Sequence, residues 1–167
     1  DLNQYISVIN APTEDKPYMR SYTVEMLGNV VGGKEVKYIN LDMEDFKKLA
    51  IDQLESGESV WFGCDVGQFS NNISGIMALN TYELEDLFDV DFSTSKADRL
   101  MYGESLMTHA MVLTGVDIVD GKPTRWKVEN SWGDKVGHKG YYVMADDWMD
   151  QYTYQIVVRR DLLTDQQ

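Results

Sequence analysis

The sequence holds a single cysteine, Cys64, among its 167 residues. One cysteine excludes an internal disulfide bond and the cysteine clusters that hold structural zinc, and it fits a reducing compartment. The longest apolar runs are short, and none approaches the roughly 20 residues that a membrane-spanning helix needs. The first residues show neither the basic start nor the apolar stretch of a signal peptide. We therefore expect neither a membrane partner nor a secretion signal.

Basic side chains are also few, with 15 lysines and arginines against 28 aspartates and glutamates and a net charge of -13. Because an acidic surface repels phosphate backbones, we expect no nucleic-acid partner. The chain is nevertheless 43% hydrophobic and 11% aromatic, which is enough for a real core. Its length fits one domain, residues 1–167.

Residues 42–56 give the clearest helix signal. Asp42 is a typical N-cap residue, apolar side chains recur at helical spacing from Phe46 to Leu54, and Gly57 supplies a stop. Two short helices are expected within the acidic segment 82–102. Strands are expected at 5–10, 21–27, 35–41, 59–66, 106–119, 124–131, 140–145 and 153–159. This order predicts an α+β fold with a mostly antiparallel sheet at the C-terminal end.

Asp120-Gly121 is a strong signal for a β-hairpin with a two-residue turn. Such a turn places His109 opposite Trp132 and Met111 opposite Asn130. His109 and Asn130 are then diagonal neighbours on one face of the sheet, within reach of each other. A loop with an odd number of residues would break this arrangement, because a one-residue slip turns every side chain to the other face.

A histidine held by an asparagine amide oxygen is a useful catalytic unit. The asparagine fixes the ring's orientation and tautomer, which leaves the other ring nitrogen free to act on a thiol. Trp132 could cover the His109–Asn130 hydrogen bond and exclude water. Taken alone, however, His109 could equally be a structural histidine on a strand. Likewise, Asn130 to Gly133 could be ordinary chemistry at a strand end.

Three segments share a resemblance to one known family. Residues 106–111 (LMTHAM) and 128–133 (VENSWG) resemble the histidine and asparagine segments of papain-like cysteine peptidases. Together with residues 60–67 (VWFGCDVG), they are most similar to the aminopeptidase C and bleomycin hydrolase branch. The resemblance implies that His109 moves protons and Asn130 orients it. It also implies a papain-like fold, mainly the antiparallel β-barrel-like half with flanking helices.

The nucleophile of that family is missing from the sequence. In the family, the reactive cysteine lies in a Gly-x-Cys-Trp-like segment far upstream of the histidine, and no such segment precedes His109. We therefore expect a C-terminal part of the enzyme that is inactive by itself, with the N-terminal part absent. Cys64 lies in an apolar strand beside Asp65, whose charge would raise a thiol pKa, so it is a poor nucleophile. Asp65 could instead line the substrate cleft.

The resemblance further implies a cytoplasmic thiol aminopeptidase that acts on peptides without a cofactor and assembles as a hexamer. In that family a C-terminal arm imposes exopeptidase action. The sequence given stops at Gln167, soon after the last expected strand, so we expect it to lack the arm, and the choice between endo- and exopeptidase action stays open. Two alternatives remain. One is a non-catalytic acidic module that binds peptide or another subunit, and the other is a transglutaminase-like acyl transferase. The sequence upstream of Asp1 would separate them.

Overall fold

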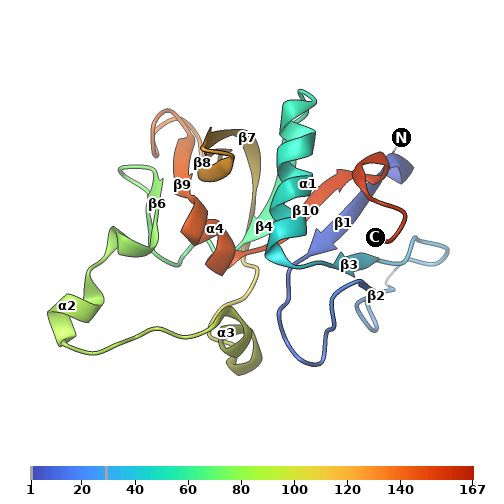
Figure 1. The fold of residues 1–167 in the computed structure, drawn as a ribbon, viewed down its shortest axis with the longest axis horizontal. Helices are drawn as coiled ribbons and strands as arrows, with labels where there is room; N and C mark the ends of the chain where they lie inside the picture. Colours follow the sequence, from blue (N-terminus) through green and yellow to red (C-terminus); the bar gives the residue numbers. More distant parts are fainter. Residues whose placement is uncertain (1, 29) are drawn as a thin grey trace.

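The computed structural model describes residues 2–28 and 30–167, and within them ten strands form one mixed sheet (Figure 1). The strands are β1 (Tyr5–Ile9), β2 (Arg20–Tyr22), β3 (Tyr38–Asn40), β4 (Val60–Cys64), β5 (Ser70–Asn71), β6 (Ile76–Met77), β7 (His109–Val119), β8 (Lys122–Glu129), β9 (Tyr141–Ala145) and β10 (Thr153–Arg159). The helices are α1 (Met43–Glu55), α2 (Leu84–Phe88), α3 (Lys96–Tyr102) and α4 (Asp146–Tyr152).

The sheet has the order β2-β3-β1-β10-β4-β7-β8-β9-β6-β5. Its central neighbours, from β1 through β9, are all antiparallel, whereas the β1–β3 and β6–β9 pairs are parallel. The predicted α+β class and the mostly antiparallel sheet are therefore confirmed. None of the described helices is long and apolar enough to cross a membrane.

Helix α1 confirms the clearest sequence signal. The Asp42 side chain accepts a hydrogen bond from the Asp45 backbone N–H at 2.9 Å, which satisfies one of the free donors at the helix start. The helix buries Phe46, Leu49 and Ala50 and packs against β10, β7 and β4. These contacts join α1 to the core cluster, whose largest fully buried apolar side chains are Trp126, Trp148, Tyr142, Phe46, Phe62, Leu41, Met77, Leu113, Met144, Met149 and Ile156.

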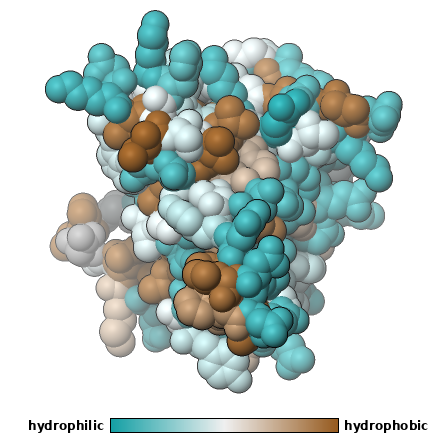
Figure 2. Space-filling model, turned by 90° about the vertical axis from the view of Figure 1, so that its left-hand side faces the viewer, coloured by the Kyte–Doolittle hydropathy of each residue, from teal (hydrophilic) through white to brown (hydrophobic). Residues whose placement is uncertain are grey.

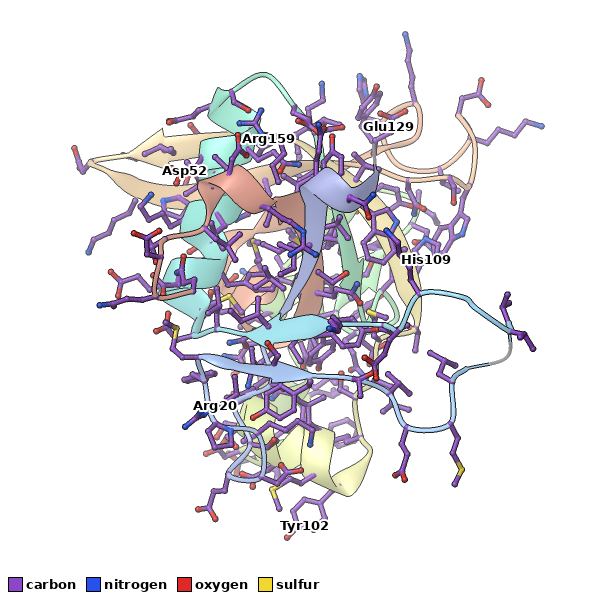
Figure 3. The ribbon with its side chains drawn as sticks, turned by 90° about the vertical axis from the view of Figure 1, so that its right-hand side faces the viewer. Arg20, Asp52, Tyr102, His109, Glu129 and Arg159 are labelled. Carbon is purple, nitrogen blue, oxygen red and sulfur yellow. The ribbon has the colours of Figure 1, made fainter. Side chains whose placement is uncertain are left out.

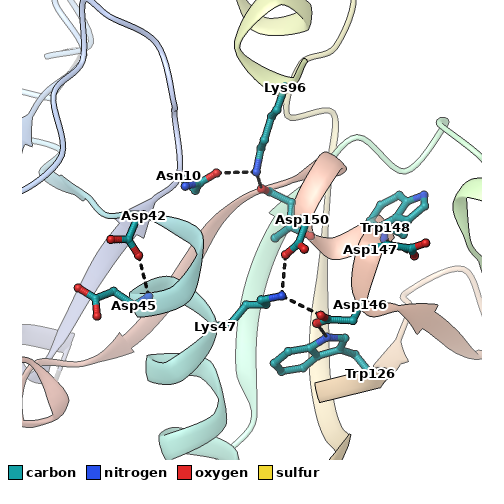
Figure 4. A network of polar contacts seen from close by, with 11 residues as sticks. Asn10, Asp42, Asp45, Lys47, Lys96, Trp126, Asp146, Asp147, Trp148 and Asp150 are labelled. Carbon is teal, nitrogen blue, oxygen red and sulfur yellow. Dashed lines mark hydrogen bonds and ion pairs between the residues drawn. The ribbon is translucent and has the colours of Figure 1, made fainter. Parts of the chain in front are cut away.

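Lys47 connects helices α1 and α4 to the sheet (Figure 4). Its ammonium group lies 2.8 Å from the Asp146 carboxylate and 2.7 Å from that of Asp150. Asp146 also accepts a hydrogen bond from the Trp126 indole at 3.0 Å. Burial alone would lower the pKa of Lys47, but hydrogen bonds to the two carboxylates raise it above its ordinary value. The two ion pairs of Lys47 join α1 to α4, and the hydrogen bond from Trp126 to Asp146 joins α4 to β8.

The β7–β8 hairpin has the predicted two-residue turn, with positive φ at Asp120 (50°) and Gly121 (76°). Val119 lies opposite Lys122, as this turn requires. Farther along, the pairing shifts by one residue at Thr124 and shifts back at Thr114, because each is an extra residue in its own strand. The two bulges cancel.

Several element boundaries differ from the sequence expectation. The strand expected at 106–119 begins only at His109, because residues 105–108 form an irregular segment. The strands expected at 21–27 and 35–41 shrink to three residues each in β2 and β3. Helix α4 was not predicted. The two short helices expected within 82–102 are confirmed as α2 and α3.

The acidic segment that contains α2 forms an arm outside the sheet (Figure 1). Its apolar side chains are at least 40% exposed: Leu84, Leu87, Phe88, Val90 and Phe92. Figure 2, turned so that the left-hand side of Figure 1 faces the viewer, shows brown apolar groups among teal polar ones on that face. The arm therefore alternates apolar and acidic groups at the surface and adds little to the core.

Candidate active site

His109 and Asn130 meet at the end of the β7–β8 pair. His109 is the first residue of β7, and Asn130 directly follows Glu129, the last residue of β8 (Figure 3). The His109 Nε2 atom lies 2.9 Å from the Asn130 Oδ1 atom, a hydrogen-bond distance. Because the two bulges cancel, Val112 lies opposite Glu129, which is the pairing expected from an unbroken hairpin. The two side chains thus reach each other as the hairpin argument predicts.

The surroundings of Asn130 determine which ring nitrogen of His109 carries the proton. The backbone N–H of Ser131 donates to Asn130 Oδ1 at 2.8 Å, so this atom must be the oxygen of the amide. An amide oxygen only accepts, and His109 Nε2 therefore donates a proton to it. The Nδ1 atom remains as the basic nitrogen, and no described residue forms a hydrogen bond to it.

The Trp132 indole lies against the His109 imidazole. The ring centroids are 4.7 Å apart and the ring planes are tilted by 32°. Trp132 is 43% exposed, whereas Asn130 is only 7% exposed. The more exposed indole thus packs against the imidazole ring whose hydrogen-bond partner, Asn130, is buried.

Backbone contacts hold the loop from Ser131 to Gly140, which carries Trp132. Gly140 accepts a hydrogen bond from the Asn130 N–H at 3.0 Å, and the Gly137 N–H donates to the Asn72 carbonyl at 2.8 Å. Gly137 has a φ of +54°, and a Cβ atom there would lie 2.4 Å from the Tyr141 carbonyl oxygen. A larger residue at 137 does not fit without moving the loop.

Cys64 is the backbone partner of His109 on the neighbouring strand β4, yet its thiol lies in the core. It is 0% exposed. Burial and then the negative charge of Asp65 raise the pKa of the thiol far above its ordinary value. A thiol in this state carries almost no thiolate at neutral pH, so the geometry gives Cys64 the properties of a small core residue.

Asp65 lies beside the site but points inward. Its carboxylate is 7% exposed and accepts hydrogen bonds from Ser105 at 2.8 Å, from Thr108 at 3.1 Å and from Gln68 at 3.3 Å. The sequence drew attention to Asp65, and to Thr108 only as part of residues 106–111, but not to Ser105. Their hydroxyls come from a segment about 40 residues away, and only the meeting of β4 with β7 brings them to the carboxylate.

The other histidine, His138, lies in a tight turn where its backbone pairs with Tyr141, and it lines a pocket with Gly115 and Lys127 that includes neither His109 nor Asn130. Among the residues that the structure describes, no group of three or more His, Cys, Asp or Glu side chains is arranged to hold a metal ion. The His109–Asn130 hydrogen bond offers the chemistry of a histidine base held by an amide.

Comparison with known proteins gives concordant matches. Residues 1–167 match the model of the "Peptidase C1-like family". The chain is 65% identical to Aminopeptidase C of Lactococcus lactis subsp. lactis (strain IL1403), over all of this chain and 38% of that protein. It is 66% identical to Aminopeptidase C of Streptococcus thermophilus, over 98% of this chain and 37% of that protein.

A solved structure agrees with these matches. The crystal structure of PepW from Lactobacillus rhamnosis HN001 superposes with a TM-score of 0.98 at 64% identity, over 99% of this chain and 37% of that one. The chain thus spans less than two fifths of the length of the relatives that it matches.

Proposed function

Because this chain belongs to the peptidase C1-like family of papain-like cysteine peptidases, we propose that it supplies the histidine and asparagine of a cysteine aminopeptidase. The single observation that carries the proposal is the 2.9 Å hydrogen bond between His109 Nε2 and Asn130 Oδ1, with Nδ1 left as the basic nitrogen. On this proposal the chain is the C-terminal part of the enzyme, and the nucleophilic cysteine lies in the other part.

The mechanism follows from the state of His109. Its Nδ1 atom takes the proton of the incoming thiol, and the thiolate–imidazolium pair is the reactive form. The thiolate attacks the carbonyl carbon of the peptide bond, and the imidazolium returns the proton to the leaving amine, which gives a thioester. His109 then takes a proton from water as the water oxygen bonds to the carbonyl carbon of the thioester. The C–S bond breaks, the acid product leaves, and the thiolate–imidazolium pair is restored.

Asn130 and Trp132 support this cycle without entering the reaction. Asn130 holds the ring so that Nδ1 keeps the same direction through each proton transfer. The indole of Trp132 keeps water away from the hydrogen bond, which strengthens it because the local dielectric constant is lower. We assign Trp132 to shielding the site. Asp65 is buried, which does not favour a role in substrate binding.

The relatives named Aminopeptidase C support removal of residues from the free amino end of peptides. Cytoplasmic location and assembly as a hexamer stay predictions, and the choice between endo- and exopeptidase action stays open. Within the 167 residues, the buried thiol of Cys64 cannot serve as nucleophile, so this chain alone is expected to hydrolyse nothing.

The buried thiol of Cys64 favours a second candidate, a non-catalytic acidic module that binds peptide or another subunit. The net charge of -13 and the lack of an accessible thiol agree with such a role. The two candidates differ in what surrounds this chain in the encoded protein. An upstream Gln followed by a Gly-x-Cys-Trp segment supports the peptidase, and its lack supports the module.

The test uses the complete enzyme that contains this chain. His109→Ala should lower kcat/KM for an aminoacyl chromogenic substrate by about 10³–10⁴-fold, because removal of a triad member abolishes proton transfer. His138→Ala is the matched control, since this second histidine lies outside the site, and it should leave kcat/KM unchanged. If the His109→Ala enzyme is folded by circular dichroism and keeps a kcat/KM near that of the wild type, the proposal is wrong.

A further inference from the structure

A buried carboxylate lies one residue from the strand partner of His109. Asp65 directly follows Cys64, which pairs with His109 across β4 and β7. The Asp65 N–H donates to the Tyr152 carbonyl at 3.0 Å, so the backbone at 65 is fixed by a neighbouring element. The side chain is 7% exposed and therefore faces the protein interior.

This carboxylate holds the segment that leads into His109. Residues 105–108 lie in no helix or strand, so their backbone lacks the regular bonds that would otherwise fix it. Thr108, the residue before His109, is tied twice to the end of β4. Its N–H donates to the Cys64 carbonyl at 3.0 Å, and its hydroxyl donates to Asp65 Oδ1 at 3.1 Å.

The other end of the segment is held by the second carboxylate oxygen. Ser105 is 1% exposed, and its hydroxyl donates to Asp65 Oδ2 at 2.8 Å. The same hydroxyl lies 2.5 Å from the Tyr154 hydroxyl. Since the Ser105 proton is directed to Asp65, Tyr154 is the donor in this contact. A one-way chain of hydrogen bonds therefore runs from Tyr154 through Ser105 and ends on the carboxylate.

No lysine or arginine forms an ion pair with this carboxylate in the described part of the chain, residues 2–28 and 30–167. Burying a charge without a counter-ion costs free energy, and a neutral acceptor would cost less at a position with no further task. What the charge adds is stronger hydrogen bonds, since those to an ionised acceptor are about twice as strong as neutral ones. Strong bonds at both ends of a four-residue segment hold it rigidly.

We propose that Asp65 is a positioning residue, which fixes the 105–108 segment through Ser105 and Thr108 and thereby sets the place of His109 relative to the incoming thiol. This inference rests on the proposed function. Without the carboxylate, two buried hydroxyls lose their acceptor and the segment before His109 relaxes. A displacement of about 1 Å at a catalytic group can lower turnover on the order of 10²-fold.

The test again uses the complete enzyme. Asp65→Ala should lower kcat about 10²-fold with little change in KM, because the substrate is still bound but the base is displaced. Thr108→Val, which keeps the shape of the side chain and removes one donor, should give a smaller loss in the same direction. Asp65→Asn keeps one acceptor oxygen and should recover part of the activity.

The pH profile of inactivation by iodoacetamide reports the thiolate–imidazolium pair. A variant that only loses stability would not shift this profile. A displaced His109 stabilises the pair less. We therefore expect the acidic limb of the Asp65→Ala and Thr108→Val profiles to move to higher pH and the basic limb to lower pH. Asp146→Asn is the matched control. The Asp146 carboxylate also accepts two hydrogen bonds, but its donors are Lys47 and Trp126 and not the segment before His109. This substitution should lower thermal stability and leave both limbs in place.

The outcomes separate the two hypotheses. If His109→Ala abolishes turnover while folded Asp65→Ala and Thr108→Val enzymes keep wild-type kcat and both limbs, Asp65 has no positioning role and only this inference fails. If Asp65→Ala does not fold, the isosteric Thr108→Val enzyme decides the question by the same measurements. If His109→Ala retains turnover, the proposed function itself fails.

Discussion

Replacement of Gly137 by alanine measures how closely the loop that carries Trp132 packs on its surroundings. Gly137 has a φ of +54°, and a Cβ atom built there lies 2.4 Å from the Tyr141 carbonyl oxygen and 3.2 Å from the Tyr142 ring. Gly121 is the matched control. Its φ is +76°, and a Cβ atom there meets nothing within 4 Å. Both substitutions impose a left-handed conformation on alanine, but only one of them creates a clash.

The magnitudes follow from this comparison. Alanine in the left-handed region costs about 1–2 kcal/mol, and this is the whole expected loss for Gly121→Ala. Gly137→Ala carries in addition an overpacking cost of about 2 kcal/mol, since neither the Tyr141 backbone nor the buried Tyr142 ring can move aside easily. For a domain of this size, that excess lowers the unfolding midpoint by about 4–8 °C.

The assay is thermal unfolding of the 167-residue chain, followed by the fluorescence of its four tryptophans. We expect Gly137→Ala to unfold several degrees below Gly121→Ala, and Gly121→Ala to unfold slightly below the parent. Equal midpoints for the two variants would refute the reasoning, because they would mean that the loop yields to the added methyl group at no cost.

Two further predictions concern the surroundings of His109. At pH 8, iodoacetamide should label Cys64 in the folded chain at least about 10²-fold more slowly than in the chain unfolded in urea, because the raised pKa leaves almost no thiolate. Rapid labelling that depends on His109 would contradict the assignment of Cys64 to the core. In the complete enzyme, Trp132→Ala should lower kcat/KM about tenfold, because water then reaches the Asn130 hydrogen bond. Trp61→Ala is the control, since it removes an indole of 38% exposure from the outer face of β4, and it should leave kcat/KM unchanged. Equal kinetics for the two variants would argue against shielding.

The features that were predictable from the sequence are those set by local signals. The cap at Asp42 and the stop at Gly57 define helix α1 to within a residue or two at each end. Asp120-Gly121 defines the turn, and the turn brings His109 to Asn130. In each case a short run of residues contains both the signal and the backbone conformation that it requires.

The features that were missed depend on contacts between distant segments. Helix α4 has buried aromatic residues at Trp148 and Tyr152, and its seven residues are too few for a clear helical period. The Asp65 cluster joins a strand end to a segment 40 residues further along the chain. The bulge at Thr114, which restores the register that the bulge at Thr124 shifts, was also missed, although Gly115 directly follows it and an isolated glycine within a strand indicates a bulge.

The paired bulges restrict how the length of this hairpin can vary in evolution. Side chains alternate between the two faces of a strand, so a one-residue insertion or deletion between Thr124 and Glu129 turns Asn130 away from His109. A change of one residue in β8 must therefore be matched by a compensating change in either strand. The tip around Asp120 lies beyond both bulges, and a change of an even number of residues there leaves the orientation of Asn130 unchanged.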